Sequence, residues 1–216
     1  MKKLFTTILA ASLMLVAFNA NAQLSAGAGY INATEKVTYT NGNTSTTEAT
    51  GLNGFYIGGQ YDMPVPSVSG LGVNAGLYAN FLFGGGHSDG FYGLGAGTTK
   101  DTSISLNIPV NATFGFDLSG DTNVFAFAGP TFQFGLVNKN VFVPDSDKST
   151  STTTDNYGGD DPRYNRFNLL IGGGIGAQVA GIKVVVGVDQ SLLNYINVDK
   201  YSGSRFQLKI GVGYAF

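Results

Sequence analysis

The sequence predicts an all-β protein, an eight-stranded antiparallel up-and-down transmembrane β-barrel, and three observations support this prediction. Eight segments alternate, residue by residue, between apolar side chains and small or polar ones, which is the period of a strand with two different faces. Charged residues make up only 12% of the chain, and 32 of its 216 residues are glycine. Beyond the N-terminal region, no apolar stretch is long enough for a membrane-spanning helix. A chain with apolar strand faces can still cross lipid as a closed barrel.

The N-terminus predicts export. Two lysines precede an apolar run over residues 4–18, and the small-x-small sequence of residues 20–22 follows. This is the pattern of a secretory signal peptide, so we expect a signal peptide over residues 1–22 and a barrel domain over residues 23–216. An N-terminal helix or membrane anchor is the alternative, but the run is short for a membrane span. The chain has no cysteine, so it contains neither disulfides nor a lipid-anchored cysteine.

Charge and glycine spacing argue against two kinds of ligand. Without the two N-terminal lysines the chain carries 10 basic and 14 acidic side chains, a net charge of −4, and a nucleic-acid partner needs a basic surface. The glycine-rich segment 172–176 lies within a predicted strand with no helix after it, so it lacks the context of a phosphate-binding loop. We therefore expect no nucleic-acid partner and no cofactor.

The predicted strands follow one another along the chain, and the fourth is the clearest. Its apolar residues from Ile104 to Phe116 alternate with serine, asparagine and threonine. Pro109 and Pro130 fall inside strands, where each removes a ladder donor, so we expect a bulge or an interruption of pairing there. The eight segments cover residues 24–30, 55–61, 71–83, 103–117, 124–136, 167–179, 182–192 and 204–216.

The last strand carries the most specific signal. Its apolar residues from Phe206 to Phe216 alternate with small or polar ones, and the chain ends on Phe216. This ending resembles the C-terminal assembly signal of bacterial outer-membrane β-barrels, with Tyr214 and Phe216 in its two aromatic positions. The chain from residue 23 onward resembles the small OmpA/OmpX-type family of outer-membrane barrels. The resemblance implies a place in the cell outer membrane, contact with outer-membrane lipids and lipopolysaccharide, and insertion by the barrel-assembly machinery.

The connections between the predicted strands alternate in length. Outer-membrane barrels have long extracellular loops and short periplasmic turns, so this alternation predicts that both termini are periplasmic. The long connections cover residues 33–53, 84–101 and 138–165, the one over 194–202 is intermediate, and the short ones cover 64–70, 118–121 and 180–181.

The composition of the polar face predicts which face lines the lumen. A soluble, periplasmic lipocalin-like lipid binder would show the same alternation with the faces reversed, and its polar face would then need many charged residues. Here that face is mostly small and uncharged, which suits the side-chain-filled interior of a narrow barrel and argues against an open pore. The charged residues expected to point inward are Asp62, Asp117, Lys183, Asp189, Arg205 and Lys209.

Turn positions predict two contacts inside the barrel. The connection between the last two strands is centred near Asn197, which places Asp189 beside Arg205 as a lumenal ion pair. The turn at residues 118–121 likewise places Gly115 opposite Phe125, whose ring is expected to lie over the glycine.

His87 is the only histidine, in the sequence Gly-His-Ser-Asp. A triad-like cluster of this kind would suit a barrel that deacylates or acylates lipid A, but triads are defined by geometry rather than by adjacency. The glycines around His87 leave the backbone free, so we expect no catalytic residue and no enzyme. The third long loop carries five aspartates but lacks EF-hand spacing, so no metal site is expected at Asp145, Asp147, Asp155, Asp160 and Asp161.

The family resemblance implies adhesion, envelope integrity or binding of an unknown surface ligand through the extracellular loops. Two alternatives stay open at this point. One is an outer-membrane lipid A deacylase-like enzyme that uses the His87 loop. The other is the soluble lipid binder with reversed faces.

Overall fold

The computed structural model describes residues 23–88, 96–120, 122–159 and 162–216. The predicted signal peptide, residues 1–22, lies outside the described residues. Within the described residues, the first strand begins at Gln23, the residue at which the mature chain is predicted to start.

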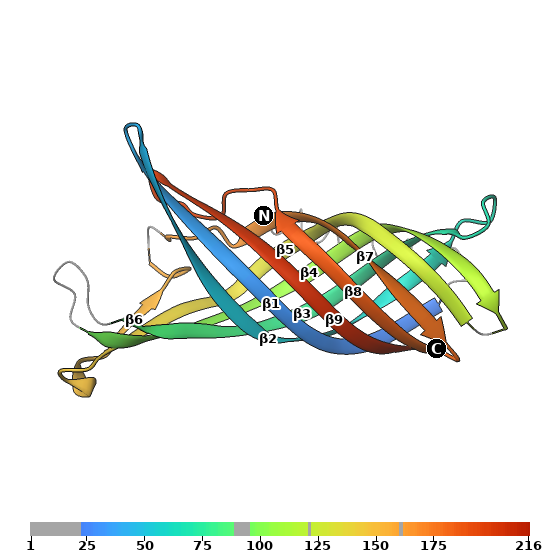
Figure 1. Cartoon of the computed structure of the whole chain (residues 1–216), viewed down its shortest axis with the longest axis horizontal. Helices are drawn as coiled ribbons and strands as arrows, with labels where there is room; N and C mark the ends of the chain where they lie inside the picture. The colour runs from blue at the N-terminus through green and yellow to red at the C-terminus, as the bar shows by residue number, and fades with distance from the viewer. Residues whose placement is uncertain (1–22, 89–95, 121, 160–161) are drawn as a thin grey trace.

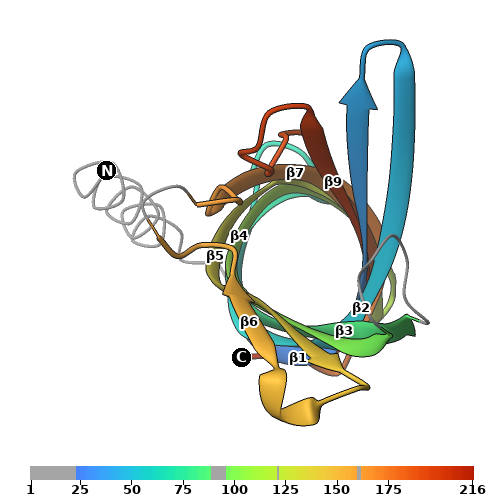
Figure 2. The ribbon, with the colours of Figure 1, turned by 90° about the vertical axis from the view of Figure 1, so that its left-hand side faces the viewer.

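Eight long antiparallel strands close into a ring, which Figure 2 shows from one end. Each strand pairs with the next one along the chain, and β1 pairs with β9 to close the ring. A short strand, β6 (Thr152–Asp155), pairs with the end of β5, and a 3₁₀ turn, η1 (Lys148–Thr150), precedes it. The ring strands are β1 (Gln23–Asn41), β2 (Thr44–Pro64), β3 (Leu71–Ser88), β4 (Gly97–Ser119), β5 (Thr122–Pro144), β7 (Phe167–Val179), β8 (Ile182–Ser191) and β9 (Tyr201–Ala215).

The two ends of the barrel differ, as Figure 1 shows. At one end, here called the turn end, β1 begins, β9 finishes, and the connections at 65–70, 120–121 and 180–181 are short. At the other, the loop end, β5 and β7 are joined through η1 and β6. The Ala180-Gly181 turn has positive φ at both residues, 48° and 83°, which is the type I′ geometry that matches strand twist.

The predicted loop over residues 33–53 is wrong, because these residues extend the sheet. β1 and β2 continue to Asn41 and Thr44 and form a hairpin that projects from the barrel (Figures 1 and 2). The segment is rich in threonine, which favours strands, and Gly42 has a φ of 60°, as the first position of a type II′ turn requires. The predicted loops over 84–101 and 138–165 are also partly strand.

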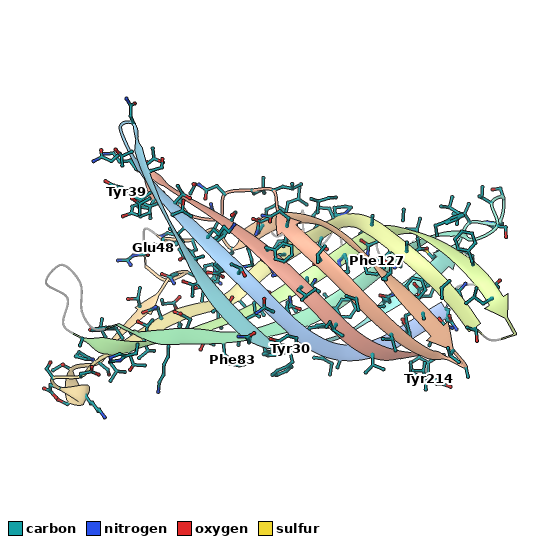
Figure 3. All side chains as sticks on the ribbon, viewed as in Figure 1. Tyr30, Tyr39, Glu48, Phe83, Phe127 and Tyr214 are labelled. Atoms are coloured by element: carbon teal, nitrogen blue, oxygen red, sulfur yellow. The ribbon has the colours of Figure 1, made fainter. Side chains whose placement is uncertain are left out.

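The apolar face is outside, as predicted. Ile175 is 67% exposed and Phe116 is 59% exposed, whereas Asn107 and Gln207 are almost fully buried inside the ring. Figure 3 places Tyr30 and Phe83 on the outside toward one end and Tyr214 toward the other. The alternative of a soluble lipid binder with reversed faces is therefore wrong. In the described part of the chain, no helix has the length and apolar character needed to cross a membrane.

Pairing is interrupted beside the two prolines, as predicted. The β4–β5 ladder skips the residues between the pairs Pro109–Thr131 and Ala112–Ala128 and then resumes in the same register. The bulges lie elsewhere, at Ile104/Ser105 and Asp117/Ser119. A missing proline N–H thus costs a local ladder bond without changing the register.

Aromatic rings fill the lumen by lying over glycines. Gly115 faces Phe125 in the ladder, as predicted, but the ring of Phe125 turns toward Gly176, where an added Cβ would lie 2.8 Å from ring atom Cε2. The prediction that this ring covers Gly115 is therefore wrong. The three atoms nearest to a Cβ on Gly115 would be two of the Asn123 side chain and the Cβ of Phe125, at 3.1 to 3.3 Å. The glycines of β7 thus provide the space for inward rings.

Candidate functional site

Among the residues that the structure describes, three ion pairs lie in the lumen at successive levels. β9 runs from the loop end to the turn end, so its inward residues mark depth. At the loop end Arg205 pairs with Glu35, and deeper in the barrel Lys209 Nζ lies 2.5 Å from Asp189 Oδ2. Near the turn end, Lys183 Nζ lies 2.7 Å from Asp62 Oδ2. Only Lys183 on β8 and Asp62 on β2 join strands that are not neighbours in the ring, so this pair braces the cross-section, whereas the other two pairs join neighbouring strands.

Arg205 is the most completely enclosed of these cations, with 4% of its surface exposed. Its guanidinium donates to Glu35 Oε1 and to Gln133 Oε1, the latter at 3.1 Å. Its backbone N–H donates to Ser191 Oγ at 2.8 Å, and the guanidinium carbon lies 5.5 Å from the ring centre of Tyr195. Charge, hydrogen bonds and an aromatic face together stabilise the buried cation.

The predicted Asp189–Arg205 pair does not form. The β8–β9 register places Asp189 opposite Gln207, so Arg205 and Lys209 are its diagonal neighbours on either side. Glu35, on β1, lies directly opposite Arg205 and forms the ion pair with its guanidinium, while Asp189 pairs with Lys209. The prediction failed because it treated residues 33–53 as a loop and so left Glu35 out of the lumen.

Glu35 is the charged lumen residue that the sequence analysis missed. Its inward position continues the alternation of β1, where the inward residues Ile31 and Ala33 are fully buried. Apolar residues on the inner face broke the expected pattern of small or polar residues there. Following the period of two beyond Ala33 would have placed Glu35 inside the barrel.

Tyrosines from the loop-end connections pack over this end of the lumen. The rings of Tyr164 and Tyr195 meet edge to face at 5.3 Å, and Tyr164 forms an isolated bridge with Ile196. Gly203 provides the space for this packing, since a Cβ there would lie 2.7 Å from Ile196 and 2.9 Å from Tyr195. Burial, followed by the negative charge of Glu35, raises the pKa of Tyr164 to about 12 and raises that of Tyr195 further. Both rings therefore stay neutral at physiological pH.

Side chains close the middle of the lumen. Ile31, Leu82 and Leu170 are fully buried. A cavity of about 90 Å³ remains inside the ring, and rings such as those of Tyr56 and Phe127 line it. Larger hollows of about 820 Å³ and 500 Å³ open at the turn end and the loop end. The prediction of a filled lumen agrees with this arrangement.

His87 lies on β3 opposite Thr98. Its Nε2 atom is 3.7 Å from Asp145 Oδ2, and both side chains are about half exposed. The structure thus brings His87 to an aspartate of another connection, while Asp89 of the predicted cluster lies outside the described residues.

Two aspartates of the third connection, Asp147 and Asp155, serve local turns. Asp147 caps η1, where its carboxylate accepts the Ser149 hydroxyl and N–H, and these two hydrogen bonds lower the pKa of Asp147. Asp155 accepts the N–H of Tyr157 at 3.0 Å. Across the described ranges no group of three acidic, histidine or cysteine side chains could hold a metal ion; Asp160 and Asp161 lie outside these ranges.

The predicted assembly signal lies on the outer surface of the turn end. Tyr214 is 52% exposed and Phe216 is 72% exposed, with their rings edge to face at 5.3 Å. The N–H of Phe216 donates to the carbonyl of Leu24 at 2.8 Å. The last residue therefore belongs to the seam between β1 and β9.

No protein-family model matches the chain, and no curated protein matches it. Among solved structures, Ail, the attachment invasion locus protein of Yersinia pestis, is 13% identical with a TM-score of 0.42, over 90% of this chain and 99% of Ail. The outer membrane enzyme PagL is 12% identical with a TM-score of 0.45, over 89% and 98% of the two chains. OprG from Pseudomonas aeruginosa is 12% identical with a TM-score of 0.41, over 90% and 95%. Similarities this distant carry no argument about what this chain does.

Proposed function

We propose that this protein is an integral barrel of the cell outer membrane, with a structural, adhesive or surface-ligand-binding role carried by its loop end. The observation that carries the proposal is the outer surface of the ring, where large apolar side chains such as Ile175, Val212 and Phe116 are more than half exposed. Water would penalise such a band at about 25 cal/mol for each Å², whereas lipid tails are its natural solvent. The filled lumen supports a binding or structural role rather than transport.

A heat-shift gel of outer-membrane fractions combined with protease shaving of intact cells tests this proposal. We expect the unheated protein to migrate as a compact species and the heated protein to migrate more slowly. On intact cells, protease should cut within the projecting hairpin, residues 34–51, and should spare the turn at 180–181. Recovery of the protein in the soluble periplasmic fraction without a heat shift would contradict membrane insertion.

The same proposal assigns His87 no catalytic role. The exposed contact with Asp145 supports a surface position for His87 rather than a protected catalytic site. We expect the lipid A mass spectrum to be unchanged when the protein is expressed, with or without the His87→Ala substitution. A mass shift that appears with wild type and disappears with His87→Ala would instead favour the lipid-modifying enzyme.

A further inference from the structure

The seam that closes the ring ends in a pair of tyrosines. The ladder of β1 with β9 runs from the pair Ser25–Ala215 to the pair Tyr39–Tyr201, and Figure 3 places Tyr39 on the projecting hairpin. The two rings are in contact, with their centres 4.8 Å apart and their planes inclined by 38°. We call Tyr39 and Tyr201 the seam tyrosines. The register thus brings together two phenols that are distant along the chain.

Backbone hydrogen bonds hold both seam tyrosines in place. The N–H of Thr40 donates to the carbonyl of Lys200 at 2.9 Å, so the contact of β1 with the last connection continues beyond the final ladder pair. The N–H of Tyr201 donates to the carbonyl of Val198 at 3.1 Å. The side-chain amide of Asn194 donates to the carbonyl of Tyr201 at 3.3 Å. The backbone is therefore fixed on both sides of the two rings, and they stay close together.

The seam tyrosines differ from other tyrosine pairs in exposure and in ring orientation. Tyr201 is 40% exposed, and Tyr39 is partly exposed. Two other tyrosine pairs meet edge to face, at 79° and 77°, and one ring of each pair is buried; they are Tyr56–Tyr78 inside the ring of strands and Tyr164–Tyr195 over its loop end. A reagent dissolved in water therefore reaches the seam tyrosines more readily than either of these two pairs.

Tyrosine is the readily oxidised side chain that this protein exposes. Thiols and thioethers are the usual targets of oxidants, but the chain has no cysteine and it also has no tryptophan. In residues 23–216 the one methionine is Met63, and only 8% of its surface is exposed. One-electron oxidation at the surface of this protein is therefore left to phenols.

We propose that the seam tyrosines are a site of oxidative crosslinking, at which a dityrosine bond joins β1 to β9. The oxidant is of the peroxidase and hydrogen peroxide class, and it removes one electron and one proton from each phenol. The two phenoxyl radicals combine through ring carbons next to the hydroxyls, and the hydrogens on those carbons move to the phenol oxygens. One carbon–carbon bond forms, the protein loses two hydrogens, and hydrogen peroxide is reduced to two molecules of water.

Contact between the two rings favours coupling within one molecule. Groups that are already held together react in a unimolecular step, which is much faster than an encounter between separate molecules. The bond that forms closes a covalent loop between the first and the last strand of the ring. A crosslink of this kind restricts the unfolded chain and holds the seam together when strands open locally. This inference goes beyond the proposed function and requires only the folded ring.

The test treats the purified chain, folded in detergent, with horseradish peroxidase and hydrogen peroxide and then unfolds it completely for a denaturing gel. We expect a monomer band that migrates faster than the untreated chain, because a crosslinked chain keeps a closed loop when it is unfolded. This band should show dityrosine fluorescence and a mass lower by two hydrogens. Proteolytic digestion should join the peptide that contains Tyr39 to the peptide that contains Tyr201. The yield should not depend on protein concentration.

Phenylalanine variants identify the residues that react. Tyr39→Phe and Tyr201→Phe keep the ring but remove the hydroxyl at which the radical forms, so each should abolish the faster band and keep the heat shift. Tyr164→Phe is the matched control and should keep the band. A faster band in Tyr39→Phe, or a crosslink that maps to other tyrosines, would overturn the proposal. So would an unchanged wild-type chain in a tube where free N-acetyltyrosine is oxidised. Because the protein is heat-shifted in detergent, a failure here is distinct from a failure of membrane insertion.

Discussion

Arg205 illustrates how a single residue depends on the strands on both sides of it. Its charge is matched by Glu35 on β1, and its backbone N–H donates to the hydroxyl of Ser191, the last residue of β8. An inward cation at this position was predictable from alternation alone. Its partner was not, because partner choice depends on the register of β8 with β9 and on how far β1 extends.

Removing one member of the buried Arg205–Glu35 pair should destabilise the barrel. Arg205→Met leaves the carboxylate of Glu35 without its cation, so we expect a loss of about 3–5 kcal/mol. Adding Glu35→Leu should recover part of this loss, because the uncompensated charge is then removed. Urea unfolding in detergent, followed by the heat-shift gel, measures both effects.

The double variant Asp189→Leu with Arg205→Met is the matched control. Asp189 pairs with Lys209, so we expect the two effects to add without recovery. Recovery in this variant rather than in the Glu35 variant would restore the pairing predicted from the sequence.

Gly176 and Gly115 differ in how much room they leave for a side chain. A Cβ on Gly176 would lie 2.8 Å from the carbonyl oxygen of Val184 and from ring atom Cε2 of Phe125. Gly176→Ala should therefore cost about 1–3 kcal/mol through overpacking, and Phe125→Leu should relieve part of that cost. Gly115→Ala should be milder, since its nearest neighbours can move. Equal unfolding midpoints for the two alanine variants would contradict this packing.

Among the elements, the β1–β2 hairpin departs furthest from the sequence prediction. Threonine- and asparagine-rich composition suggested a loop, yet Thr38 and Thr47 face each other across the ladder with hydroxyls 2.9 Å apart. Cross-strand contacts of this kind stabilise a polar strand. Composition alone does not reveal them, because they depend on the register set by Gly42. The strands inside the ring were predictable because their two faces meet different surroundings.

Phe216, the residue that follows β9, should matter more for assembly than for stability. Loss of the Phe216 side chain removes about 1–3 kcal/mol of apolar burial at most, since the ring lies at the rim of a zipped sheet. If the barrel-assembly machinery recognises Tyr214 and Phe216, a chain lacking Phe216 should accumulate unfolded in the periplasm. It should still fold from urea into detergent. Failure of both routes would assign Phe216 a structural role.

For the whole molecule, the closed ring and the direction of its faces followed from alternation, scarce charge and abundant glycine. The closure of the lumen by Ile31, Leu82 and the loop-end tyrosines could not be predicted in this way, because apolar residues on the inner face break the alternation on which the prediction depends. The separation of β2 from β3 beyond Leu52 and Gly84 was also invisible in the sequence, since it depends on where their pairing stops. Both features arise from contacts between segments that are distant along the chain.

Single-cysteine labelling tests the central claim that this ring spans the outer membrane with its apolar face in lipid. The chain has no cysteine, so Thr47→Cys, Ile175→Cys and Gly120→Cys each report one position, at the projecting hairpin, the outer surface and the turn end. With a water-soluble maleimide that does not cross the outer membrane, we expect Thr47→Cys to react on intact cells and Gly120→Cys to react only after lysis. Ile175→Cys should react only with a lipid-soluble maleimide. Rapid labelling of Ile175→Cys by the water-soluble reagent in folded protein would contradict the account.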